Sequence, residues 1–217
     1  MRTFVLILAA MPLFACSRKL DAKFEGAIVM RTTVAGRPPQ DLQLEIKGGK
    51  MRFDTKSDAA EPMHGVYDPV QNRVLVFMDT QRVYLTLDFS KAAAPVPNTT
   101  PEASTAEKSG GKDSVAGIAC ENWVAKEPSG KRSEVCVVDG VNFFDLTRLR
   151  QGATGLASMG KAGMQDKKMF PLRSVEYDER GQELSRMEVQ SVEPRSVDDA
   201  RFGMPVGYKP LEVPVVK

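Results

Sequence analysis

This 217-residue chain has three cysteines and one histidine, residue types that support covalent and metal chemistry. The first, Cys16, ends an apolar run that follows the short positive start Met1-Arg2. That run is too short to span a bilayer and has the layout of a secretory signal peptide. It closes in Leu13-Phe14-Ala15-Cys16, which resembles a bacterial lipobox, where cleavage leaves the cysteine as a lipid-modified N-terminus. We therefore expect residues 1–15 to be a signal peptide and Cys16 to carry acyl chains, which together hold a protein stably on a membrane. The alternative is an ordinary secretory peptide cut nearby, which leaves Cys16 discarded or free.

The residues after Cys16 indicate where the folded body lies. Seven residues separate Cys16 from the first strand-like residue, Phe24, and fully extended they reach about 25 Å. We therefore expect residues 16–23 to form a lipidated tether that keeps the domain near the bilayer. Ser17 follows the cysteine, and a residue other than aspartate at this position favours the outer membrane in bacterial sorting. The prediction is an exported protein of the cell envelope, anchored in the outer membrane and facing the periplasm.

Cys120 and Cys136 are the two cysteines that remain beyond the lipobox. Both lie in a predicted hairpin whose midpoint falls near Pro128, so each is eight residues from that point. Residues equidistant from a turn face each other across the strands, at a spacing that a disulfide can span. An exported bacterial protein also meets an oxidising compartment. We expect a structural disulfide. The alternatives are two free thiols and a redox pair, and the latter lacks both Cys-x-x-Cys spacing and a nearby histidine.

His64 is the single histidine of the chain, and a Ser-His-Asp or zinc site would have to use it. Neither a nucleophile elbow nor paired metal-ligand spacing accompanies it, which favours a hydrogen-bonded or exposed strand histidine. Gly48-Gly49-Lys50 lies between two predicted strands, so it indicates a turn instead of a phosphate-binding loop. We predict a non-catalytic protein without a metal or cofactor. A glycosidase-like pair of carboxylates leaves no pattern in a β-protein sequence, so an enzyme stays the third hypothesis.

The composition is that of a globular protein, with 42% hydrophobic and 27% charged residues. The formal net charge of +2 falls to about +1 once Arg2 is removed, which gives no electrostatic case for nucleic acid. Most of the 11 methionines lie beyond the signal peptide. Their side chains repack easily, which suits a cavity for acyl chains or variable peptides. The alternative is that they fill an irregular core.

Beyond the tether, the dominant pattern is the alternation of apolar and polar residues, with a period of two. Apolar residues alternate with polar ones in the segments that begin at Phe24, Leu42 and Met51, which predicts antiparallel strands with one face buried and the other exposed to water. Three pairs of β-rich runs flank short turns and predict hairpins. These pairs are 73–78 with 82–87, 117–126 with 132–138, and 170–177 with 182–192. Because no crossover helices separate the runs, we do not expect a parallel α/β sheet.

Two stretches break this alternation. Residues 91–113 are rich in Ala, Pro, Thr, Ser and Gly, and we expect a flexible surface loop there rather than a domain boundary. Residues 143–168 carry large apolar side chains among several glycines, so 143–150 is a candidate helix and the rest is irregular. The pattern predicts a single β-rich domain over residues 24–217.

Several short sequence motifs between about residues 24 and 210 resemble those of a known family. They are Phe24-Glu25-Gly26, 49–54 (GKMRFD), Val83-Tyr84, 115–123 (VAGIACENW), Phe170-Pro171-Leu172, Met187-Glu188-Val189 and the closing 201–209 (RFGMPVGYK). Together they resemble a bacterial family catalogued as domain of unknown function 4412, and the closing phrase is the most specific part. Cys136 departs from what is general in that family, which suggests that the bridge is a local addition.

Such sequences are similar in outline to the lipoprotein-localisation-factor fold, a strongly curved, incomplete antiparallel barrel whose mouth is closed by helices over a hydrophobic cavity. The resemblance implies a mainly β protein: a strongly curved antiparallel sheet or incomplete β-barrel with one or two short helices over its mouth. It implies no catalytic residues. Lipid or lipopeptide binding is an expectation by fold analogy alone.

Two hypotheses for the function follow. The first is a membrane-anchored binding module that holds a lipid or another apolar ligand between the inner face of the sheet and the 143–169 segment. The second is an envelope scaffold or protein-interaction domain with a fully packed core and no ligand. Alternation identifies the apolar face but does not say whether the sheet closes on itself. The ligand-binding candidates are Phe24, Ile28, Met30, Leu44, Ile46, Met51 and Phe53 on the inner face, with Phe144, Leu149 and Met159 on the lid.

Overall fold

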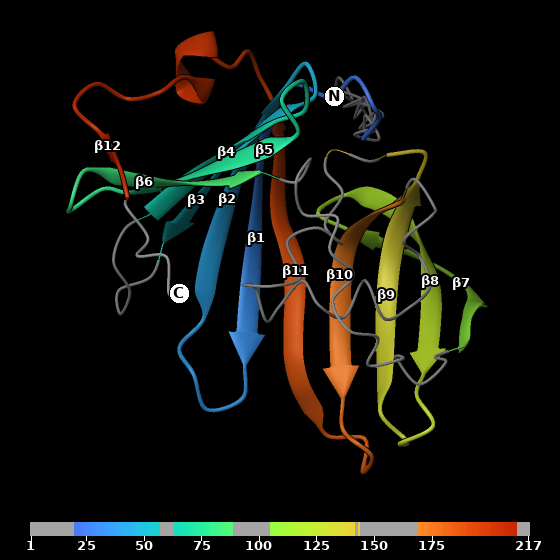
Figure 1. Cartoon of the computed structure of the whole chain (residues 1–217). Coiled ribbons are helices and arrows are strands. Elements are labelled where there is room, and N and C mark those ends of the chain that lie inside the picture. Colours follow the sequence, from blue (N-terminus) through green and yellow to red (C-terminus); the bar gives the residue numbers. More distant parts are fainter. Residues whose placement is uncertain (1–19, 57–62, 89–104, 142, 144–168, 212–217) are drawn as a thin grey trace, which may run out of the picture.

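The computed structural model describes residues 20–56, 63–88, 105–141, 143 and 169–211, and nearly all of its regular structure is β (Figure 1). The elements are β1 (Gly26–Val34), β2 (Gln40–Lys47), β3 (Lys50–Lys56), β4 (Met63–Asp68), β5 (Arg73–Met78), β6 (Val83–Asp88), β7 (Thr105–Val115), β8 (Ile118–Lys126), β9 (Arg132–Asp139), β10 (Met169–Tyr177), β11 (Glu183–Pro194), the 3₁₀ helix η2 (Asp199–Phe202) and β12 (Lys209–Pro210).

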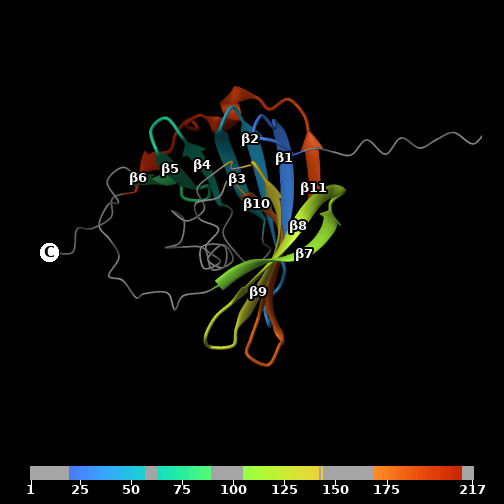
Figure 2. The ribbon, with the colours of Figure 1, turned by 90° about the vertical axis from the view of Figure 1, so that its right-hand side faces the viewer.

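The described strands form one open, curved sheet in the order β12-β6-β5-β4-β3-β2-β1-β11-β10-β9-β8-β7. The two-residue strand β12 runs parallel to β6, and the other neighbouring pairs are antiparallel. Pairing of β1 with β11 joins an N-terminal meander, β1 to β6, to a C-terminal one, β7 to β11. The edge strands β7 and β12 do not pair with each other, so the sheet does not close into a barrel. In side view, β4, β5 and β6 bend away from the plane of β1 and β11 (Figure 2).

Local sequence accounts for the register of the central strands. The β2–β3 turn has Gly48 and Gly49 with φ of 56° and 80°, a left-handed pair that suits a two-residue hairpin turn. The turn predicted at Gly48-Gly49-Lys50 is confirmed. The resulting register places Leu44 opposite both Ile28 of β1 and Phe53 of β3. Because side chains alternate along a strand, this register brings the predicted apolar residues to a common face.

The C-terminal segment, residues 195–211, lies over the convex side of the sheet and is called the C-terminal strap below (Figure 2). An outer cluster packs beneath it and consists of Val66, Leu75, Phe77, Val197 and Phe202. The side chains that alternate with these on β3 to β5 therefore face the concave side. They belong to a larger inner cluster formed by Leu20, Phe24, Ile28, Met30, Leu44, Ile46, Met51, Val74, Val115, Ile118, Cys120, Cys136, Val141, Phe143, Phe170, Leu172, Met187, Val189 and Val192.

The three hairpins predicted from sequence are confirmed. They correspond to β5–β6, β8–β9 and β10–β11, and the strand ends differ from the expected ones by one or two residues at most. The mainly β, antiparallel character and the strong curvature are confirmed as well. We expected either a curved sheet or an incomplete barrel, and the structure shows an open sheet.

The prediction of a flexible loop over residues 91–113 is wrong for residues 105–113. Residues 105–113 belong to β7, an edge strand that pairs with β8, whereas 91–104 lie outside the described residues. The register shifts between Lys108 and Lys112, where Gly110 has a φ of 77°. A polar, glycine-rich segment can therefore stay in the sheet through backbone hydrogen bonds and a bulge, without burying an apolar face.

The expected helices over the mouth of the sheet are not found in the described residues. The one helical element described is η2, which lies with the C-terminal strap against β3 on the convex side (Figure 1). Its N-cap is Asp198, whose side chain accepts a hydrogen bond from the N–H of Ala200. The candidate helix at 143–150 falls, except for its first residue, outside the described residues.

Candidate functional site

The seven inner-face residues predicted from alternation gather in the inner cluster. The fully buried members are Phe24, Ile28, Met30, Leu44, Ile46 and Met51, with exposed fractions of 0 to 8%. Phe53 is half-buried and packs against them. The three lid candidates, Phe144, Leu149 and Met159, lie outside the described residues, as does the lipidation candidate Cys16. Alternation therefore grouped these side chains correctly, and their role in ligand binding stays a prediction.

The position of Phe53 depends on a glycine in the neighbouring strand. Gly65 of β4 lies directly opposite Phe53 of β3. A Cβ on Gly65 would overlap three carbons of the Phe53 ring, so the ring lies across the backbone of β4. Glycine within a strand is unfavourable by roughly 0.5–1 kcal/mol relative to alanine. Here its lack of a side chain makes room for an aromatic ring on the concave side.

Cys120 and Cys136 form the expected disulfide, with 5.4 Å between their Cα atoms. The predicted cross-strand alignment is wrong by two residues, because Cys136 lies opposite Asn122. The hairpin turns around Ser129 rather than Pro128, as shown by the hydrogen bond from the N–H of Glu127 to the carbonyl of Lys131. The bridge is therefore diagonal. Both cysteines belong to the inner cluster, so the bridge ties β8 to β9 within the core.

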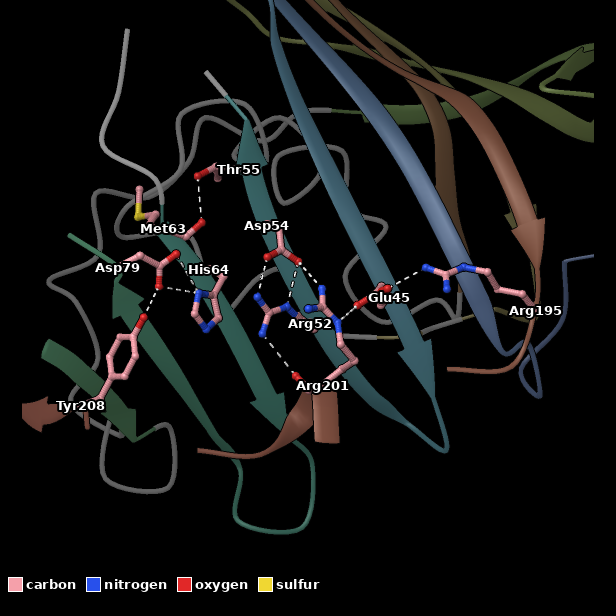
Figure 3. A network of polar contacts seen from close by, with 10 residues as sticks. All are labelled: Glu45, Arg52, Asp54, Thr55, Met63, His64, Asp79, Arg195, Arg201 and Tyr208. Atoms are coloured by element: carbon pink, nitrogen blue, oxygen red, sulfur yellow. Dashed lines mark hydrogen bonds and ion pairs between the residues drawn. The ribbon is translucent and has the colours of Figure 1, made fainter. Parts of the chain in front are cut away.

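A polar network on the convex side fixes the C-terminal strap to the sheet (Figure 3). Its centre is Glu45 of β2, whose side chain is 5% exposed and accepts hydrogen bonds of 2.7 Å from Arg195 and from Arg201. Arg52 holds Asp54 at 2.6 and 2.9 Å, and Arg201 approaches the same carboxylate at 3.7 Å. Two guanidinium partners offset the cost of burying Glu45. The hydrogen bond to Glu45 raises the pKa of Arg201 above its ordinary value.

The far end of the strap is held by a second group of polar side chains (Figure 3). Tyr208 donates a 2.6 Å hydrogen bond to Asp79, and Nδ1 of His64 lies 3.1 Å from the other oxygen of that carboxylate. Burial opposes ionisation of Asp79. The hydrogen bonds from Tyr208 and His64, with the charge of Arg52, outweigh burial and lower the pKa of Asp79. The hydrogen bond to Asp79 raises the pKa of Tyr208.

His64 is a buried structural histidine. It is 5% exposed and stacks on Phe77, with 4.6 Å between the ring centroids. The expected hydrogen-bonded strand histidine is confirmed at Nδ1, while Nε2 has no hydrogen-bond partner among the described residues. Alternation in the segment that begins at Leu42 placed Glu45 on the face expected to meet water, and the register of the sheet places His64 on the same face. The strap covers that face, and the signal that could have found it is the specific closing phrase that contains Tyr208.

A cavity of about 240 Å³ lies between β7, β8, β9 and β10, apart from the predicted inner-face residues. Its walls are Ser109, Asn122, Trp123, Val124, Glu134, Val135, Cys136 and Arg173. Arg173 already pairs with Asp113 at 2.6 Å, and Glu134 accepts a 3.3 Å hydrogen bond from Tyr177. The hydrogen bond from Arg173 lowers the pKa of Asp113. The charged groups of the cavity are therefore engaged with the protein itself.

Neither a metal site nor a membrane-spanning helix occurs in the part of the chain that the structure describes. No three His, Cys, Asp or Glu residues among these positions are grouped so that they could hold a metal ion. Likewise, no helix in the described segments has the length and apolar character needed to cross a bilayer.

The fold and these sites define a class of protein: a β-domain built on one open, curved sheet, with an apolar cluster on its concave side and its own C-terminal strap on its convex side. Residues 24–208 match the family described as Domain of unknown function (DUF4412). The chain belongs to this family, which confirms the resemblance noted in the sequence. A search of curated proteins found no match.

Solved structures with a similar fold share little sequence with this chain. An uncharacterized conserved protein from Thermus thermophilus aligns with a TM-score of 0.54 at 10% identity, over 87% of this chain and 90% of that one. The Pseudomonas aeruginosa MucA/MucB complex gives 0.46 at 12% identity, over 84% of this chain and 56% of that one. A LolA superfamily protein from Nitrosomonas europaea gives 0.38 at 14% identity, over 86% and 92%. At these identities, the likeness to the Thermus protein supports the fold alone.

Proposed function

We propose that this protein is a non-catalytic binding protein of the bacterial cell envelope, anchored through Cys16, that holds a lipid or another apolar ligand against the concave side of its sheet. The observation that carries the proposal is the inner cluster, which extends from β1–β3 to β8–β11 of a sheet that is not closed. The described strands all belong to this sheet, so within the described residues no second sheet covers that side. Burying an acyl chain there would contribute about 0.8 kcal/mol per CH₂ group.

The residue types of the inner cluster suit a ligand of variable shape. Met30, Met51 and Met187 are buried in it. Methionine has an unbranched, flexible side chain that adapts to irregular partners, so these residues could repack around chains of different length. Phe53 and Leu42 are only half-buried at the same cluster, which supports access from the concave side.

The described polar groups support binding rather than catalysis. His64 is the single histidine, and its ring is enclosed by Phe77 and the C-terminal strap. Its carboxylate partner, Asp79, is engaged by Tyr208. A general base needs access to a substrate proton, and this arrangement offers none at Nδ1. A role for this group in holding the strap accounts for its contacts.

The anchor is supported by Leu13-Phe14-Ala15-Cys16 and by Ser17, which favours the outer membrane. Expression of the full chain and of Cys16→Ser in a Gram-negative host, with labelled palmitate, tests it. We expect the wild-type protein to incorporate label and to partition with outer membranes, and the variant to lose the label. Unlabelled wild-type protein in the soluble periplasmic fraction would contradict the anchor.

The ligand is tested with protein exported behind an ordinary secretory signal, beginning at Ser17 and purified without detergent. Native mass spectrometry should reveal a co-purified lipid, and the protein should take up a fluorescent fatty acid. Leu42→Arg places a charge on the concave side and should abolish uptake, whereas Gln43→Arg, one residue along on the convex side of β2, should retain it. Circular dichroism establishes that both variants fold. Absence of both lipid and uptake in the wild-type protein would refute ligand binding.

A second candidate function is an envelope scaffold or protein-interaction domain with a packed core and no ligand. The observation that favours it is the burial of the inner cluster, whose fully buried members are at most 8% exposed. Such burial is also what a core filled by its own side chains produces. A crystal structure without a cavity larger than a water molecule on the concave side, together with ligand-free mass spectra, would favour this candidate.

A further inference from the structure

The N-terminal tether is shorter than the sequence indicates, because the fold begins before the first strand. Leu20 is 3% exposed and belongs to the inner cluster. The chain then turns at Asp21, whose carbonyl accepts a 3.1 Å hydrogen bond from the N–H of Phe24 and whose side chain accepts one of 2.8 Å from the N–H of Lys23. Four residue steps therefore separate Cys16 from a buried side chain, a span of about 14 Å at full extension.

The register of the sheet determines which end lies at this tether. Gly26, at the start of β1, pairs with Ile46 near the end of β2, and this row of pairs continues to Val74 at the start of β5. The β2–β3 turn at Gly48–Gly49 and the β4–β5 turn at 69–72 consequently project from the end of the sheet where the described chain begins (Figure 1). We call this the tether end.

The tether end presents a strongly exposed apolar side chain. Val70, in the β4–β5 turn, is 89% exposed. Its turn is well ordered by hydrogen bonds, since the N–H groups of Val70 and Gln71 both donate to Oδ1 of Asp68 at 2.9 and 3.2 Å. Pro69 also lies beside the β2–β3 turn, because a Cβ on Gly49 would be 3.8 Å from its Cγ. The valine is therefore held outward on a supported turn and contributes little to the core.

Three of the basic side chains near this end are paired within the protein. Lys47 lies 3.1 Å from Asp199, and Arg195 and Arg201 both bond to Glu45. These basic side chains are already neutralised by the protein. Proximity imposed by the tether is then what would chiefly bring this end to a membrane, with attraction to anionic lipid left to exposed lysines such as Lys23 and Lys50.

We infer that the tether end is a membrane-contacting surface, with Val70 in the headgroup region of the bilayer that holds the acyl chains of Cys16. The inference rests on the anchor in the proposed function and adds an orientation to it. A nine-residue strand such as β1 is about 30 Å long, more than twice the reach of the tether. The opposite turns, including the β8–β9 turn with Ser129, therefore stay away from the bilayer.

A single introduced thiol tests this orientation, because Cys120 and Cys136 are bridged and Cys16 is acylated. Val70→Cys and the control Ser129→Cys, both at exposed turns, are labelled with an environment-sensitive fluorophore in the full lipidated chain. The proteins are placed in vesicles of phosphatidylethanolamine and phosphatidylglycerol that carry a lipid-bound quencher. We expect a blue shift and quenching at position 70 and neither at position 129. Salt should not abolish this contrast, since screening weakens only charge attraction.

A longer tether provides a second test of this orientation. A flexible insertion of about 20 residues between Ser17 and Arg18 should leave flotation with vesicles unchanged. It should lower quenching at position 70, because the local concentration of the domain at the bilayer falls roughly fifteenfold with the −3/2 power of tether length. Protein that floats without quenching at position 70, or with equal quenching at both positions, overturns this inference and leaves the anchor intact. Protein that does not float overturns both.

Discussion

Replacing Gly65 with alanine tests how closely Phe53 packs on the neighbouring strand. Gly65 of β4 faces Phe53 of β3, and an added Cβ would overlap three carbons of the aromatic ring. Gly65 is not among the glycines with positive φ, so alanine suits its backbone. The substitution therefore introduces a steric conflict without backbone strain.

The magnitude follows from two opposing effects. Overpacking of this kind costs about 1–3 kcal/mol. Alanine in place of glycine recovers about 0.5–1 kcal/mol, because it reduces the freedom of the unfolded chain. Phe53 is half-buried, so its ring can swing toward the concave side and the lower part of the overpacking range applies. We expect a net loss of about 1 kcal/mol, or about 2–4 °C in Tm for a domain of this size.

Urea unfolding followed by circular dichroism measures this loss, with two comparisons. Gly203→Ala is the matched control, since the nearest atom to its added Cβ is the carbonyl oxygen of Ala200 at 3.5 Å, an ordinary contact. In a Phe53→Leu background the ring is gone, and Gly65→Ala should then stabilise the protein by about 0.5–1 kcal/mol. An unchanged stability in the single variant, or the same loss in both backgrounds, would refute the packing argument.

Three further perturbations have defined outcomes. Cys120→Ser removes the disulfide and should cost about 3 kcal/mol on the chain-entropy model, measured by thermal unfolding. Tyr208→Phe removes a hydrogen bond to a partly exposed carboxylate and should cost about 1 kcal/mol at neutral pH, measured by urea unfolding. Burial opposes ionisation of Asp79, yet the hydrogen bonds from Tyr208 and the histidine keep its pKa below the ordinary value. The stabilisation is therefore present above the unfolded pKa of Asp79 and is lost as the pH falls through the lower folded value, so wild-type and variant stabilities should converge in acid. Glu45→Gln weakens the anchorage of the strap and should cost about 2 kcal/mol in urea unfolding, whereas Asp41→Asn breaks a surface pair and should cost at most about 0.5 kcal/mol.

Each of these outcomes can be contradicted. Wild-type protein that unfolds at the same temperature with and without reductant would show that the bridge does not stabilise the domain. A constant gap between wild type and Tyr208→Phe from neutral to acidic pH would contradict the linkage to Asp79. Equal losses for Glu45→Gln and Asp41→Asn would contradict the special role of the buried carboxylate.

Much of the strand content could be predicted, because a half-buried strand must alternate apolar and polar residues. The period-two segments at Phe24, Leu42 and Met51 all became strands of the central sheet. β7 could not be predicted in this way. It is an edge strand ordered by backbone hydrogen bonds to β8, and such bonds leave no mark on side-chain composition.

The candidate sites differ in the same way: those that depend on local sequence could be predicted, and those that join distant segments could not. The cysteine pair was predictable because hairpin symmetry and an oxidising compartment are visible in the chain, although the turn centre shifted the alignment by two residues. The buried pair of Glu45 with Arg195 was not. The two residues are 150 positions apart, and nothing local in β2 indicates that its polar side is covered.

By itself, the sequence determined which side chains share a face, where the tight turns fall, which cysteines could bridge and where a lipid anchor could be attached, because each of these depends on short-range geometry. Only the tertiary structure decided that the sheet stays open, that β1 meets β11, that the C-terminal strap covers the convex side, and that Leu20 shortens the tether. These features depend on contacts between distant segments, whose favourable free energy arises only once the whole sheet has formed.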